Sequence, residues 1–225
     1  MKKVILTFIS FVFISSSFGC DNVANSSSGV ATSTQQATSL KQQSSNPNVV
    51  ANTEKIKFKT EGGSDLFALK QKEDSAKLVD ANDKEIARIK IEENNQVKLK
   101  SVSDKTLGYI VSEKEHWKLA NSENKELYTL QKINNNYKLK DWSNREIYQI
   151  KKRDYGFDIE KANNKLMYKV KVKEGKTSLR DKDDKTIFST KLELTPIAFA
   201  CFGLDTLTRE QQAALAYTVN LTQGR

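Results

Sequence analysis

The sequence predicts a mainly β protein: an antiparallel meander of about 12–14 short strands closed into a barrel around a C-terminal hydrophobic helix, followed by a short second helix. Three observations lead to this prediction. A unit of about twenty residues recurs seven times, and each unit holds two runs with apolar residues at every second position. An apolar segment with a helix-start signal then follows the last unit.

The repeat is most visible in the apolar residue that follows each polar turn. These residues, called anchors below, are Leu66, Ile86, Leu107, Leu127, Ile147, Met167 and Ile187. Successive anchors lie 20 residues apart, except for one step of 21. Asp, Asn, Lys and Gly lie between the two runs of a unit, as turns require. Each unit therefore predicts one hairpin, and a single inserted residue explains the longer step.

Alternation within a unit predicts which side chains face inward. In NREIYQIKK (144–152), Tyr148 and Ile150 lie two positions apart on one face of a strand, and Lys151 lies on the other. The apolar face must be covered, either by folding into two layers or by closing into a barrel, which also removes exposed edges. A propeller is disfavoured, because blades use about forty residues and these units would supply only about three and a half.

The C-terminal segment predicts the contents of the barrel. About twelve strands would leave room for something as wide as a helix, roughly 10 Å. Thr195 and Pro196 resemble an N-cap followed by proline at the first helical position, and residues 197–204 are apolar all round. A capping box at 208–211 then predicts a second, amphipathic helix near 209–221. We expect helices within 195–222; a buried final strand at 196–206 is the alternative.

The N-terminus is typical of an export signal. Lys2 and Lys3 precede an apolar run at 4–14 that is too short to span a bilayer as a stable helix. Small residues follow this run and end in Ser-Phe-Gly before Cys20, which resembles the signal of bacterial lipoproteins, where the cysteine is lipidated and becomes the new N-terminus. We expect a signal peptide at 1–19, with Cys20 as lipid anchor at a bacterial envelope membrane. Ordinary cleavage with a free Cys20 is the alternative.

The next segment predicts a tether between that anchor and the barrel. Residues 20–54 are dominated by small and polar side chains and contain no aromatic residue, which is typical of a disordered linker. As a random coil this tether would reach about 30 Å. The repeat barrel follows at 55–194. The formal net charge of +9 favours anionic surfaces such as lipid headgroups, and export makes nucleic acid an unexpected partner.

The repeated units, of the form Leu … Asp/Asn-Lys-x-Ile-Tyr-x-Ile, and the segment 196–205 (PIAFACFGLD) resemble the tubby C-terminal-like superfamily. This group includes the LURP-one-related proteins and the phospholipid scramblases, and the resemblance covers residues 55–206. It implies a barrel closed around a helix and an association with membrane lipid. Tubby-like domains bind phosphoinositides through basic residues, but those positions do not map onto this chain and none is carried over.

The same resemblance implies a candidate calcium site. Scramblases carry an acidic, calcium-associated segment before their final helix, and Asp181, Asp183 and Asp184 lie in a comparable place. Here the segment lacks the aromatic-Gly continuation, and lysines interrupt it. A polar hairpin turn like those of the earlier units is the favoured interpretation.

The sequence contains no pattern typical of an enzyme site. His116 has no metal-ligand spacing around it, and the motifs of serine hydrolases, dithiol oxidoreductases and nucleotide-binding loops are absent. Cys201 lies in an apolar run, which predicts a buried and inert thiol. We therefore expect no catalytic residue, no cofactor and no metal, and a binding protein rather than an enzyme.

Two surface features exceed what the repeat requires. An outward basic residue recurs four positions past the anchor, at Lys70, Lys90, Lys151, Lys171 and Lys191. This band would attract anionic lipid, unless it serves only solubility and edge protection. Trp142 occupies a turn position where other units carry Ala, Val, Ser or Lys, and it would contact a membrane interface or partner, or pack over the barrel mouth.

The predicted function follows from these features together. We expect a non-enzymatic, membrane-anchored lipoprotein that binds anionic lipid headgroups or another envelope component at the membrane surface. A scaffold for envelope proteins, with no lipid specificity, is the alternative.

Overall fold

The computed structural model describes residues 54–93, 96–191 and 194–223. The expected signal peptide at 1–19, the lipid anchor Cys20 and all but the last residue of the expected tether lie outside the described residues.

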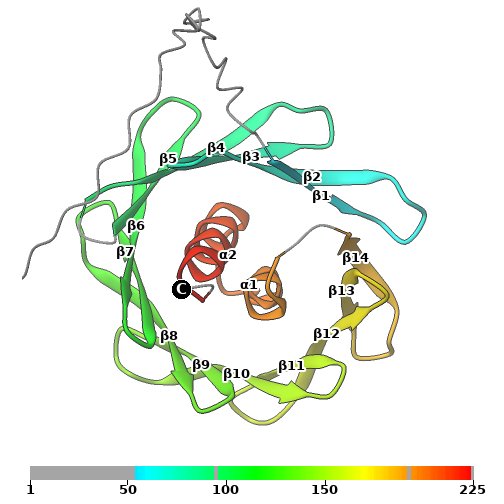
Figure 1. Ribbon diagram of the computed structural model, residues 1–225. Helices are drawn as coiled ribbons and strands as arrows, with labels where there is room; N and C mark the ends of the chain where they lie inside the picture. The colour runs from blue at the N-terminus through cyan, green and yellow to red at the C-terminus, as the bar shows by residue number, and fades with distance from the viewer. Residues whose placement is uncertain (1–53, 94–95, 192–193, 224–225) are drawn as a thin grey trace, which may run out of the picture. The chain divides into compact units, whose positions relative to one another are not determined.

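Fourteen antiparallel strands in these residues form one closed barrel, which confirms the predicted fold class (Figure 1). Each strand pairs with its neighbours in the chain, and β1 pairs with β14. The strands are β1 Glu54–Lys59, β2 Asp65–Gln71, β3 Ser75–Asp80, β4 Glu85–Ile91, β5 Gln96–Ser101, β6 Thr106–Glu113, β7 His116–Asn121, β8 Glu126–Ile133, β9 Asn136–Asp141, β10 Glu146–Arg153, β11 Gly156–Lys161, β12 Leu166–Lys173, β13 Lys176–Asp181 and β14 Thr186–Thr190.

One end of the barrel is built from the seven turns within the repeat units. We call it the rim: residues 61–64, 81–84, 102–105, 122–125, 142–145, 162–165 and 182–185. The third residue of six of these turns has a positive φ of 61–69°, and in each case it is Asp or Asn, which tolerate this conformation. The strand after each turn begins with a register shift, as between Glu146 and Tyr148. This bulge accommodates the anchor residue and lets Tyr148 and Ile150 face the interior.

The apolar C-terminal segment is helical and lies inside the barrel (Figure 1). Helix α1 (Pro196–Ala200) is capped by Thr195, whose side chain accepts a hydrogen bond from the Ala198 amide at 3.3 Å. A single 3₁₀ turn, Cys201–Gly203, continues it. The predicted helix start is confirmed, and the alternative of a buried final strand is wrong.

The second helix begins where the sequence predicts and also lies inside the barrel. Helix α2 spans Arg209–Gln223, against the expected 209–221, and every residue from 212 to 219 is buried, so it is not one-sided. Its capping box is present: the Gln211 amide donates to the Thr208 hydroxyl at 3.3 Å, and the Thr208 amide donates to the Gln211 side chain at 3.0 Å. Fourteen strands enclose more space than one helix fills, so both helices lie in the interior of the barrel.

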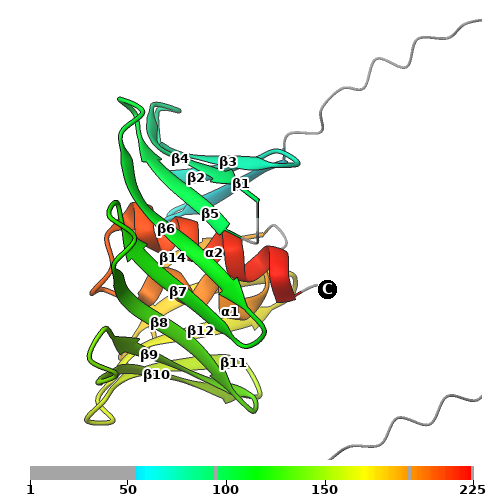
Figure 2. The same ribbon diagram turned by 90° about the vertical axis from the view of Figure 1, so that its left-hand side faces the viewer.

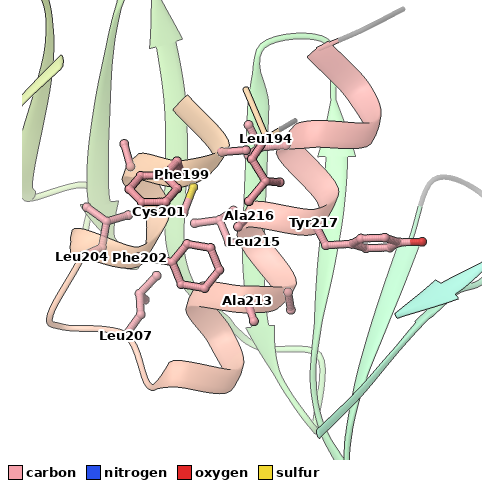
Figure 3. Packing of buried hydrophobic residues seen from close by; sticks show 14 of the residues in the cluster. Leu194, Phe199, Cys201, Phe202, Leu204, Leu207, Ala213, Leu215, Ala216 and Tyr217 are labelled. Atoms are coloured by element: carbon pink, nitrogen blue, oxygen red, sulfur yellow. The ribbon is translucent and has the colours of Figure 1, made fainter. Parts of the chain in front are cut away.

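Small side chains let the helices pack in the middle of the barrel. Ala213 and Ala216 lie beside Leu215 on α2, opposite the phenylalanines of the first helical segment (Figure 3). Close approach is visible at Gly203 as well, where an added Cβ would lie 2.6 Å from the Ile159 side chain. The apolar interior therefore consists of one continuous cluster of strand and helix residues.

The helical plug is held at both ends of the barrel. Figure 2 shows the α1–α2 connection at one end and the C-terminal end of α2 at the other. At the rim end, the Tyr168 hydroxyl donates to Asp205 at 2.7 Å, and burial together with this bond raises the pKa of Tyr168 to about 12. At the far end, the Trp117 indole donates to Thr222 at 2.9 Å.

None of the helices in the described part of the chain has both the length and the apolar character needed to cross a bilayer.

Replacing Leu215 by Ala tests the role of the plug. Leu215 has no exposed surface, so the cavity should lower the free energy of unfolding by about 2–5 kcal/mol in urea titrations. The control Leu107→Ala removes the same atoms from a side chain that is 39% exposed, and should cost less than about 1 kcal/mol. Equal losses in the two variants would show that the helices do not carry the core.

Candidate functional site

Trp142 is the most exposed large apolar side chain among the described residues, at 75%. It lies in the turn between β9 and β10, at the rim. Packing over the barrel mouth would have buried it, so that expectation is wrong. Because the Trp142 side chain is exposed to water, it does not contribute to the core. An exposed aromatic side chain of this size is typical of a binding surface.

The turn that carries Trp142 is tightly held by Asp141. One carboxylate oxygen accepts hydrogen bonds from the amides of Ser143 and Arg145, both at 3.0 Å, and from the Ser143 hydroxyl at 2.7 Å. The other oxygen faces the Arg145 guanidinium, also at 3.0 Å. The Trp142 amide donates to the Leu127 carbonyl at 3.0 Å, which fastens this turn to the preceding hairpin.

These contacts stabilise the charged form of Asp141. The Ser143 hydroxyl, the two backbone amides and the Arg145 guanidinium together hold the pKa of the carboxyl below its ordinary value. The tip of the turn is therefore a fixed platform at neutral pH.

A cation recurs at one fixed position in the rim turns. From the sequence alone, this residue was attributed only to turn formation. A Lys or Arg directly follows the positive-φ residue in six turns, and all six side chains are exposed: Lys84, Lys105, Lys125, Arg145, Lys165 and Lys185. The signal was present in the sequence as the recurring Asp/Asn-Lys pair. The rim thus presents a ring of cations that belongs to the repeat itself.

The turns nearest Trp142 carry the fewest acids. Asp83, Asp104 and Asp184 in other turns form ion pairs with strand lysines or arginines. The equivalent residue is Asn in the three turns around Trp142. We call residues 121–125, 141–145 and 161–165 the Trp142 arc; its cations are Lys125, Arg145, Lys161 and Lys165, and its acids are Glu123 and Asp141. Lys125 pairs with Glu123 and Arg145 pairs with Asp141, both at 3.0 Å.

The turns of the arc are neighbours in space. The Trp142 amide donates to the Leu127 carbonyl of the preceding hairpin, and the Ala162 amide donates to the Ile147 carbonyl at 3.1 Å in the same way. Turns two strands apart are about 10 Å from each other. An aromatic side chain flanked by cations at this spacing suits an anionic, partly apolar surface.

The five lysines of the expected band lie on the outer wall but do not form one charged surface. The strands β6 and β8 carry Val111 and Gln131 at the equivalent position, which interrupts the band. Four of the five lysines face a carboxylate, in the pairs Lys70–Asp83, Lys90–Glu92, Lys151–Glu160 and Lys171–Asp184 at 2.7–3.7 Å. The structure brings only Lys171 and Lys191 into one cleft.

The three carboxylates considered for calcium do not converge. The Asp181 side chain accepts the amides of Asp183 and Lys185, at 3.0 and 2.9 Å, and so builds its turn. Asp183 and Asp184 instead face Lys182 and Lys171. Within the described ranges no group of three or more His, Cys, Asp or Glu side chains is arranged to hold a metal ion.

Cys201 is fully buried, in agreement with the expectation of an inert thiol. Burial raises the pKa of the thiol, which disfavours the reactive thiolate, and the sulfur lies 3.5 Å from the Ile197 carbonyl.

Comparison with known proteins adds little to this geometry. No family model matches the chain, and no curated protein matches it. A search of solved structures finds an X-ray structure of a protein from Arabidopsis thaliana with a TM-score of 0.36 and 13% identity, covering 64% of this chain and 84% of that one. A likeness at that level carries no argument about family or activity. The tubby-like resemblance therefore stays a prediction.

The pKa shift of Asp141 predicts a pH-dependent effect of Asp141→Asn. Because the pKa is lowered in the folded state, the charged carboxylate adds stability above its ordinary pKa, near pH 4, and this contribution is lost as the pH falls further. The variant should unfold at lower urea concentration than the parent at pH 7, and the difference should narrow as the pH falls below about 4. Glu174→Gln, at a side chain that is 83% exposed, is the control and should show no difference at either pH. A deficit of D141N that persists unchanged at low pH would contradict a charge-based role.

Proposed function

We propose that the protein is a non-enzymatic, membrane-anchored binding protein of the bacterial envelope, and that its barrel docks the Trp142 arc onto anionic lipid. The exposure of Trp142 among the arc cations is the observation that carries this proposal. Indole side chains favour the headgroup region of a membrane, where an apolar ring and a polar N–H are both accommodated.

The charge of the arc is of the right size for reversible binding. A cation near an anionic membrane surface contributes about 1 kcal/mol, and the contribution is screened by salt. The arc holds four cations against two acids, and among the described residues Lys161 and Lys165 have no ion-pair partner. These two cations would contribute about 2 kcal/mol, which gives weak docking that a lipid anchor on the same chain would strengthen by keeping the barrel close to the membrane.

The expected tether allows this orientation. The rim lies at the end of the barrel opposite the first residue of β1, since β1 runs from Glu54 toward the turn at 61–64. An eight-residue strand is about 27 Å long, which is close to the reach of about 30 Å expected for residues 20–54 as a coil. A barrel held at Cys20 could therefore present its rim to the same membrane.

The alternative, an envelope scaffold without lipid specificity, draws support from the outer wall. The lysines of the wall are largely neutralised by neighbouring carboxylates, so the wall itself is a poor lipid-binding surface. If the arc does not bind lipid, a scaffold is the better description. The buried thiol of Cys201 and the many carboxylates held in ion pairs support a binding role over catalysis under either proposal.

Vesicle binding by charge-matched variants of the full 225-residue chain tests the proposal. Lys125→Gln/Lys161→Gln/Lys165→Gln should weaken binding to phosphatidylglycerol-containing vesicles about a hundredfold, and Trp142→Ser should also weaken it. The control Lys72→Gln/Lys114→Gln/Lys132→Gln removes the same charge away from the rim and should bind like the parent.

Comparison of the variants separates the barrel from the N-terminal segment. Any binding caused by the N-terminus alone, which carries Lys2 and Lys3, should be the same in all variants. Co-sedimentation that does not distinguish the arc variant from its charge-matched control would refute arc-mediated lipid binding and favour the scaffold.

A further inference from the structure

The outer wall of the barrel departs from its repeat at Ser178. The same outward position is a lysine in five other units and an aspartate in one: Lys57, Lys77, Lys98, Lys118, Lys138 and Asp158. Across the β13–β14 ladder, Ser178 lies directly opposite a second short side chain, Ser189. Because a serine stands where the repeat has a long side chain, the wall is hollow at this point.

A cleft of about 470 Å³ occupies this hollow, which is a volume typical of small-molecule sites. Its lining holds five cations and one acid, Glu174, around Ser178. Lys171 of β12 lies directly opposite Ser178 in the sheet, and Lys173 lies directly opposite Lys176 of β13. The stems of these long side chains form the sides of the cleft. We call it the wall cleft.

Three cations at the end of the wall cleft nearer the rim share a single carboxylate. Asp184 lies 2.8 Å from the Lys171 ammonium, 3.5 Å from the Arg180 guanidinium and 4.0 Å from the Lys169 ammonium. The hydrogen bond from Lys171, together with the charges of Arg180 and Lys169, holds the pKa of Asp184 below its ordinary value. One negative charge therefore faces three positive ones, and the excess is available to an anion.

Arg180 is held in place by its neighbours and keeps donors in reserve. Its Nε donates to the Ser178 hydroxyl at 3.2 Å, and its Nη1 donates to the Asp184 carbonyl at 2.9 Å. The described part of the chain provides no acceptor for Nη2. A guanidinium fixed in this way loses little side-chain freedom when a ligand binds.

We propose that the wall cleft binds a phosphate-class oxyanion carried by a water-soluble ligand. A tetrahedral oxyanion accepts hydrogen bonds from several directions at once, which suits the Arg180 guanidinium, the Lys171 ammonium and the Ser178 hydroxyl. The Ser178 hydroxyl makes only a long hydrogen bond, 3.4 Å, to the Lys171 carbonyl, so little is lost when it turns to a ligand.

The length of the wall cleft favours a ligand with more than one phosphoryl group. Arg180 and Lys176 lie four residues apart on β13, a separation of about 13 Å. At the second end, Lys173 and Lys176 face each other directly, and like charges in that arrangement destabilise a sheet. Glu174 lies 3.6 Å from Lys173, but both side chains are more than 80% exposed, so water screens this pair. An anion between the two lysines would relieve their repulsion.

The position of the wall cleft favours a soluble ligand over a lipid headgroup. The strands β12 and β13 form part of the side of the barrel (Figure 1), and the turn at Glu174 lies at the end opposite the rim. A flat bilayer in contact with the rim would not reach these cations. The cleft is thus separate from the Trp142 arc and does not depend on lipid docking.

Restoring the residue of the other units tests the site. Binding of sodium tripolyphosphate to the full 225-residue protein is measured by titration calorimetry, and it should be tighter than binding of orthophosphate. Ser178→Lys adds a positive charge but fills the wall cleft, so it should weaken tripolyphosphate binding at least tenfold. Attraction to a merely cationic surface would instead be strengthened by the added lysine. Unchanged or tighter binding in this variant would overturn the proposal.

A second pair of variants gives an answer that does not depend on the folding of Ser178→Lys. Arg180→Gln should weaken tripolyphosphate binding about tenfold. The control Lys100→Gln changes the equivalent repeat position, where a carboxylate, Asp104, is likewise shared by two cations but Lys98 fills the place of Ser178. It should bind like the parent, and equal losses in the two variants would overturn the proposal.

Lipid and the Trp142 arc provide the remaining comparisons. Phosphatidylglycerol vesicles should not displace tripolyphosphate, and displacement would overturn the proposal by assigning the wall cleft to lipid. Trp142→Ser should bind tripolyphosphate like the parent, so that a failure of arc-mediated lipid docking and a failure of the wall cleft are distinguishable.

Discussion

The need to fill a fourteen-stranded barrel governs the rest of this structure. Side chains from the wall alone would not occupy so wide an interior, and two helices complete it. The fit depends on small residues where helix and wall approach closely, and on hydrogen bonds that hold the helical plug at both ends of the barrel. Tyr217 reaches from α2 toward the wall on the side away from α1 (Figure 3), and burial raises its pKa to about 12.

The rim that carries the candidate surface is set by a different requirement. Six of its turns need Asp or Asn at a positive φ, and the following residue is free to be a cation. Trp142 differs from the residues at the same turn position in the other units, and its side chain is too exposed for packing to require an aromatic residue there.

The sequence predicted the barrel because its period, alternation and turn chemistry agree, and it predicted both helix starts from their caps. It did not predict that α2 is buried on all sides inside the barrel, because the amphipathic pattern near 209–221 looked one-sided and the width of the barrel was underestimated. The sequence left two options for Trp142, exposure at the surface or packing over the barrel mouth. The turn held by Asp141 leaves the side chain exposed. The band of outer lysines was found correctly on the outer wall, but cross-strand pairing with carboxylates follows from register and not from local sequence.

Depth-dependent quenching by brominated lipids tests the central claim most directly, because the chain contains two tryptophans in opposite environments. Trp142 is exposed at the rim, and Trp117 is buried and bonded to Thr222. With Trp117→Phe, emission from Trp142 should be quenched by brominated vesicles that contain phosphatidylglycerol and not by neutral ones. With Trp142→Phe, emission from Trp117 should be quenched by neither. Trp142 emission that is unaffected while the protein is bound to anionic vesicles would contradict docking through the arc.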